Sequence, residues 1–133
     1  SSIEPDAGNF DSAYLAYAID PANAYYSYMG VSVELQLAIT NTVSKEVPAD
    51  LQNVAYDDPQ MINRFKTFLD TIFTHIPDLQ LDALNIGNES DILFGTDSVK
   101  YAQFKGFLNA VVPYAKQLYY NLHGTNLKVG TTL

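Results

Sequence analysis

The chain has 133 residues, 47% of them hydrophobic and 17% charged, which is the composition of a single globular domain. Its 15 acidic and 7 basic residues give a net charge of −8, which disfavours binding to nucleic acid or to an anionic membrane surface and is compatible with a neutral ligand. The absence of cysteine excludes disulfides and thiolate zinc sites, and no apolar run reaches the roughly 18 residues of a membrane span.

The first half of the chain predicts a helix, a strand and a second helix. Residues 10–28 carry a stripe of tyrosines typical of a helix, which we expect Pro21 to interrupt. Residues 31–39 alternate apolar and polar side chains as a strand does. The next helix opens at Asp57-Asp58-Pro59, because either aspartate can cap it and proline fits a first turn. Its apolar residues recur at intervals of three and four until Pro77 ends it.

The second half repeats the alternation of strand and helix. Residues 81–88 read as a strand, residues 89–97 as a loop, and residues 98–122 as a long helix that ends at Gly124. A third strand begins at residue 127. Strands that alternate with helices indicate an α/β fold with parallel strands. A closed eight-stranded (β/α)8, or TIM, barrel takes roughly 250 residues, so we expect about half a barrel, as a fragment or as a half that needs a partner.

In such folds the chemistry collects where parallel strands meet the loops that follow them. Residues 40–56, 88–97 and 131–133 are the three such places, and the second contains a carboxylate beside a carboxamide, Asn88-Glu89, directly after a glycine. Alternation along this strand places Leu84 and Ile86 on one side and Glu89 on the other. Glu89 would therefore point into the barrel mouth.

Four segments, in this order, resemble clan A of the retaining glycoside hydrolases, a family of (β/α)8 barrels. IEPDAGNFD at residues 3–11 is similar to the family's loop after the second strand, and VPADL at residues 47–51 to the stretch after the third. Asn88-Glu89 resembles the end of the fourth strand, where the family's acid/base glutamate follows an asparagine, and KVG at residues 128–130 looks like the start of the fifth.

The resemblance implies hydrolysis of an O-glycosyl bond in a polysaccharide or oligosaccharide, with retention and without a cofactor. Glu89 would protonate the glycosidic oxygen and later deprotonate water, and Asn88 would bind the sugar 2-hydroxyl. The nucleophile of the family is a second carboxylate on the seventh strand, which this chain does not include. The expected partners are thus a carbohydrate and either the remainder of the barrel or a second copy that completes the sheet.

Other residues are weaker candidates for a site. Asp91 follows closely on Glu89 and is either a sugar ligand or a residue that structures its loop. Tyr56 and Phe94 are loop aromatics that either stack on sugar rings or, as is more common for loop aromatics, pack locally. Simpler roles are expected elsewhere: a polar layer in the barrel interior for Glu34 and Gln36, loop-amide bonding for Glu4, and helix-end positions for His75 and His123. No spacing indicates a metal or phosphate site.

Two further hypotheses stay open. The chain could be a non-catalytic half-barrel that binds carbohydrate or associates with itself. It could also be an unrelated open-sheet α/β domain in which Asn88-Glu89 is a coincidence.

Overall fold

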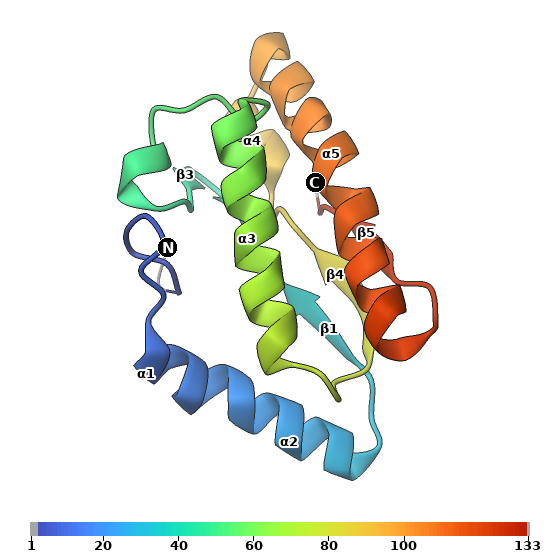
Figure 1. The fold of residues 1–133 in the computed structure, drawn as a ribbon. Coiled ribbons are helices and arrows are strands. Elements are labelled where there is room, and N and C mark those ends of the chain that lie inside the picture. Colours follow the sequence, from blue (N-terminus) through green and yellow to red (C-terminus); the bar gives the residue numbers. More distant parts are fainter. Residues whose placement is uncertain (1–2, 133) are drawn as a thin grey trace.

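Three parallel strands form the centre of the structure, a computed structural model that describes residues 3–132 (Figure 1). They are β1 (Val33–Gln36), β4 (Leu81–Asn85) and β5 (Lys128–Gly130), paired in the order β1-β4-β5. Leu35 of β1 aligns with Leu84 of β4, which aligns in turn with Val129 of β5. The predicted parallel strands, adjacent in one sheet, are confirmed, although each is shorter than its apolar pattern.

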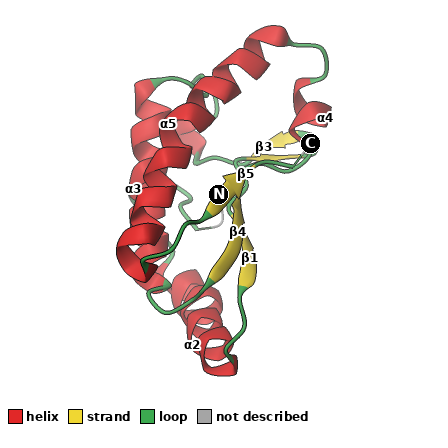
Figure 2. Cartoon of the chain, turned by 90° about the vertical axis from the view of Figure 1, so that its right-hand side faces the viewer, coloured by secondary structure: helices red, strands yellow, loops and turns green. Residues whose placement is uncertain are grey.

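Two long helices, α3 (Pro59–His75) and α5 (Ser98–His123), cover one side of this sheet (Figure 2). Each begins at a capping aspartate: Asp58 accepts a hydrogen bond from the backbone N–H of Gln60, and Asp97 accepts one from that of Lys100. Gly124 ends α5 with φ at 67°, a left-handed conformation that glycine adopts without strain. Both helices lie where the sequence predicts them.

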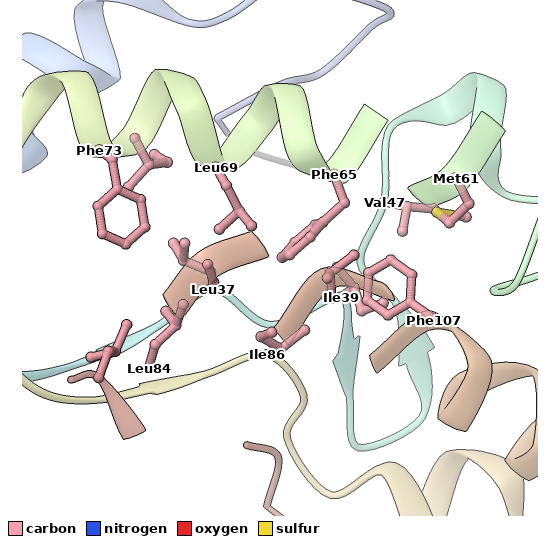
Figure 3. Close-up of a cluster of buried hydrophobic side chains, with 14 of the residues drawn as sticks. Leu37, Ile39, Val47, Met61, Phe65, Leu69, Phe73, Leu84, Ile86 and Phe107 are labelled. Atoms are coloured by element: carbon pink, nitrogen blue, oxygen red, sulfur yellow. The ribbon is translucent and has the colours of Figure 1, made fainter. Parts of the chain in front are cut away.

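The core lies between these helices and the sheet (Figure 3). Side chains of α3, among them Phe65, Leu69 and Phe73, point toward Leu84 and Ile86 of the central strand segment. Leu84, Ile86 and Leu69 are completely buried. Burying a leucine or isoleucine stabilises a fold by about 1.5–3 kcal/mol, so this layer determines which side of the sheet faces inward.

The other face of the sheet is polar and exposed in the part of the chain described. Glu34 and Gln36 of β1 point to this side, and Asn85 of β4 donates a hydrogen bond to Glu34. The predicted polar layer is therefore present, but the strands of residues 3–132 do not close into a barrel. None of the helices in residues 3–132 combines the length and the apolar character that crossing a lipid bilayer requires.

The amino-terminal helix runs without a break, contrary to the interruption expected at Pro21. Its segments are α1 (Ser12–Tyr14), a π-helical turn (Leu15–Ile19) and α2 (Asp20–Met29). The N–H of Asp20 donates to the carbonyl of Leu15, five residues back. The wider turn leaves space for the ring of Pro21. Proline has no backbone N–H to donate, and the widened turn accommodates the missing hydrogen bond, so the helix continues through Pro21.

The two long loops that were expected contain short elements. Residues 40–56 include a hairpin of β2 (Thr40–Asn41) and β3 (Ser44–Lys45) and a 3-10 turn at Ala49–Leu51. Residues 89–97 include α4 (Ser90–Phe94). Elements of two to five residues are too short to be predicted from the sequence, because a periodic apolar pattern is recognised only over several helical turns or strand alternations.

Arg64 of α3 joins two of the segments that carry the family resemblance. Its guanidinium lies 2.5 Å from Glu4 and 2.6 Å from Asp50. Glu4 is buried and also accepts a hydrogen bond of 3.0 Å from the backbone N–H of Gly8. The predicted loop-bonding role of Glu4 is thus confirmed, and its charge is compensated by an ion pair with α3.

Candidate functional site at the carboxyl ends of the strands

Backbone pairing continues past the ends of β1, β4 and β5 and brings three polar segments together. The N–H of Asn88 donates to the carbonyl of Thr40 at 3.0 Å, and that of Thr42 donates to the carbonyl of Asn88 at 3.3 Å. On the other side, the N–H of Thr132 donates to the carbonyl of Gly87 at 3.0 Å. Residues 40–42, 87–89 and 131–132 therefore lie side by side.

Glu89 occupies the centre of this edge in a strained backbone conformation. Its φ and ψ are 49° and 45°, in the left-handed region that non-glycine residues rarely adopt. Thr42, in the neighbouring segment, has φ at 53°, and these are the only non-glycine residues with positive φ in the described part of the chain. The Thr42 hydroxyl donates to Glu89 Oε2 at 2.5 Å. Two strained residues thus hold one another, and such strain is concentrated at functional sites in many proteins.

The carboxamide of Asn88 is oriented from both sides. Its Nδ2 donates to Asn41 Oδ1 at 2.9 Å, and its Oδ1 accepts a hydrogen bond of 3.1 Å from the hydroxyl of Thr132. These contacts use one of its two N–H groups and one of its two lone pairs. The remaining donor and acceptor are held in a defined direction, which suits recognition of a hydroxyl group.

Gly87 forms the base of the site because no larger residue would fit there. A Cβ at this position would lie 2.5 Å from Thr131 Oγ1 and 2.8 Å from the hydroxyl oxygens of both Ser90 and Thr40. Thr40 and Ser90 are fully buried and share a hydrogen bond of 2.8 Å. These hydroxyl groups surround Gly87, the residue that directly precedes Asn88 and Glu89.

Tyr56 and Phe94 are not exposed, as stacking on a sugar ring would require, and local packing is the arrangement observed. Both rings are buried and pack edge to face at 5.4 Å between centroids, and each also contacts Phe104 of α5. Burial raises the pKa of Tyr56 to about 12, because its phenolate would be poorly solvated. The two rings therefore belong to the core beneath the loops, where a sugar cannot stack on them.

The remaining candidates lie apart from Glu89. Asp91 is exposed in the first turn of α4, and its backbone carbonyl accepts the N–H of Gly95 at 2.8 Å. His75 and His123 are at helix ends as expected: His75 lies 2.5 Å from Asp20, and His123 stacks on Tyr119. Within residues 3–132, no group of three or more His, Asp or Glu residues is arranged to hold a metal.

A cavity of about 280 Å³ lies beside β1, next to Glu4 and Arg64. Of the residues around Glu89, only Asn41 lines it. Asn88 and Glu89 are half-buried at the carboxyl end of the central strand and do not line this cavity.

Sequence reasoning identified Asn88 and Glu89 but missed the residues that hold them, Asn41, Thr42 and Thr132. A signal was present, since both polar segments directly follow predicted strands. Threonine and asparagine are also common loop residues, so only the pairing of the strands shows which of them reach Glu89.

Comparison of the chain with protein families, with curated proteins and with solved structures found no match in any of the three.

Proposed function

We propose that Glu89 is the acid/base carboxyl of a retaining glycoside hydrolase and that this chain forms part of its (β/α)8 barrel. The proposal combines the four segments that resemble the family with the parallel sheet on which they lie. It is supported above all by one observation: Glu89 follows the central strand in a strained conformation, with its carboxylate held by Thr42 and with the oriented amide of Asn88 beside it.

In the proposed reaction Glu89 donates its proton to the glycosidic oxygen as the bond to the anomeric carbon breaks. The leaving sugar departs as an alcohol, and the anomeric carbon bonds to the nucleophile carboxylate. Glu89 then accepts a proton from water, which attacks the anomeric carbon and releases the nucleophile. The free N–H and lone pair of Asn88 would bind the 2-hydroxyl of the sugar.

The nucleophile is expected at the end of a later strand of a complete barrel. Strands β1 and β5 are the edges of the sheet in residues 3–132, and the polar face with Glu34, Gln36 and Asn85 is open. Edges of this kind accept further strands. The remainder of the barrel or a second copy is therefore the proposed partner for the sheet edges, and only the remainder of the barrel would supply the second carboxylate.

The test is Glu89→Gln, with Asp82→Asn at an exposed position of β4 outside the candidate site as the matched control, because both substitutions remove one acidic group. The assay uses the full-length protein and a panel of polysaccharides and aryl glycosides. We expect Glu89→Gln to lower the rate on polysaccharide by about 10²–10⁴-fold, since it cannot protonate the leaving group. The first step on an activated aryl glycoside should fall much less, because that leaving group needs no proton. Full activity of Glu89→Gln on polysaccharide would end the assignment.

A non-catalytic carbohydrate-binding module is the second candidate function. It is favoured by the neutral amides and hydroxyls of Asn41, Asn88 and Thr132, which suit sugar hydroxyls without any chemistry. In that case the wild-type protein hydrolyses no member of the panel, yet oligosaccharide shifts the NMR signals of the Asn88 side-chain amide in both the wild type and Glu89→Gln.

A further inference from the structure

The amino-terminal helix, Ser12 to Met29, buries little of its surface. Leu15 is its only fully buried residue, and Figure 1 shows the helix at the edge of the molecule. All five of its tyrosines are exposed, with exposed fractions of 38, 86, 59, 37 and 87% for Tyr14, Tyr17, Tyr25, Tyr26 and Tyr28. At about 100° per residue all of them except Tyr26 project to one side of the helix, which we call the tyrosine face. The helix packs on the core through Leu15 and Ile19, and its tyrosine face has no apolar partner within residues 3–132.

The near absence of charge on this helix argues against an anionic lipid surface as its partner and favours a second protein chain. Asp20 is its only charged residue, and that carboxylate lies 2.5 Å from His75. The helix has no lysine or arginine, the residues by which interfacial helices bind anionic lipid. Although the chain has a net charge of −8, two copies could approach through this face with little repulsion between charges at the contact.

The spacing of the tyrosines is symmetric about Pro21. Tyr17 and Tyr25 each lie four residues from it, and Tyr14 and Tyr28 each lie seven. In an antiparallel pair of identical helices related by a two-fold axis, residues at equal distances before and after the centre face each other. Tyr17 would meet the partner's Tyr25. The π-helical turn rotates the less exposed Tyr14 relative to α2, so the central pair carries the contact.

The exposed apolar area of the tyrosine face approaches that of a standard dimer interface. An aromatic side chain buries roughly 150–250 Å² when covered, so the exposed parts of Tyr14, Tyr17, Tyr25 and Tyr28 offer roughly 400–700 Å² per copy. Exposed Met29 and Val31 extend the same end of the helix. A standard interface buries about 800 Å² on each partner and is enriched in tyrosine and methionine.

We propose that the tyrosine face is a homodimer interface, in which helix Ser12 to Met29 pairs antiparallel with the same helix of a second copy about a two-fold axis near Pro21. This contact is distinct from any pairing at the edges of the sheet.

Sedimentation equilibrium over a range of concentrations tests the proposal on the 133-residue chain. We expect a reversible dimer whose dissociation constant rises at least about 100-fold in Tyr17→Gln/Tyr25→Gln, since tyrosines at the centre of an interface carry much of its affinity. Tyr120→Gln on α5, at an exposed tyrosine outside the face, is the control and should leave the constant unchanged. A monomer at all concentrations, or a dimer insensitive to Tyr17 and Tyr25, overturns the proposal, as does a monomer whose tyrosine face binds polysaccharide or neutral vesicles instead.

A charge exchange distinguishes a lost contact from a damaged helix. Tyr17→Lys/Tyr25→Lys and Tyr17→Glu/Tyr25→Glu should each be monomeric, because like charges face each other across the two-fold axis. Mixed in equal amounts, the two variants should form a heterodimer, with helical content by circular dichroism unchanged throughout. Failure of the mixture to associate while both chains remain helical would contradict the antiparallel arrangement.

Discussion

Leu84 and Glu89 lie close together in the sequence, one on the central strand and the other just after it, yet their surroundings differ in kind. Leu84 is completely buried between the sheet and the helices, in ordinary strand geometry. Glu89 has a left-handed backbone, and its side chain is held by a hydrogen bond from a second left-handed residue, Thr42. The helix-covered side of the sheet thus contributes buried apolar packing, whereas its carboxyl end contains two non-glycine residues in a strained left-handed conformation.

The largest expected effect on the free energy of unfolding comes from the buried side of the sheet. Leu84→Ala should lower the free energy of unfolding by about 3–4 kcal/mol, because it leaves a cavity between β4 and the helices. Asn85→Ala, at the next residue on the open face, should cost less than about 1 kcal/mol, since its bond to Glu34 is solvent-exposed. Urea unfolding followed by circular dichroism measures both. Equal decreases in the free energy of unfolding would contradict the conclusion that the helix-covered face contributes more to stability than the polar face.

The pH dependence of stability tests whether Tyr56 belongs to the core. Its pKa is about 12 in the folded state and about 10 when unfolded, so its contribution is fully present below pH 10. Between pH 10 and 12 the unfolded chain loses the phenol proton first, so the free energy of unfolding falls, by about 2–3 kcal/mol in total.

Tyr56→Phe should remove this part of the alkaline loss, as measured by urea unfolding at intervals from pH 8 to 12. Measurements at pH 8 are the internal control, because Tyr56 and its phenylalanine replacement are both uncharged there. An alkaline slope identical to that of the wild type would show that the Tyr56 phenol is solvated in the folded protein.

The smallest effect tests the strain at the site. Thr42 is the first residue of the two-residue turn between β2 and β3, a place where positive φ favours glycine. Thr42→Gly should have a free energy of unfolding about 0.5–1 kcal/mol higher than that of Thr42→Ala, because both variants lack the Thr42 hydroxyl and only glycine adopts this positive φ without strain. The same change should reduce any activity that depends on Glu89, since it removes the hydroxyl that holds the carboxylate.

Val43→Gly is the matched control for this turn. Val43 does not have positive φ, so glycine brings only its greater freedom in the unfolded chain and should lower stability by roughly 0.5–1 kcal/mol. If Thr42→Gly is no more stable than Thr42→Ala, Thr42 is not strained, and the contrast between the strained carboxyl end of the sheet and its packed core is contradicted.

Features that depend on neighbouring residues along the chain could be predicted from the sequence. Asp58 and Gly124 mark helix ends because a cap or a left-handed turn needs only a few adjacent residues. Alternation placed Leu84 inside and Glu34 outside because side chains of a strand point to opposite faces. The same local patterns were sufficient to predict parallel strands and to select Asn88 and Glu89.

Contacts between residues far apart in the sequence became visible only in the folded structure. Thr42 reaches Glu89, and Asn41 reaches Asn88, across a separation of 47 residues, through the pairing of β1 with β4. Tyr56 is buried because α5 supplies Phe104 as a neighbour, which no pattern around Tyr56 indicates. Periodicity describes which face a residue occupies along its own element. Which element covers that face depends on packing, and packing is a property of the whole chain.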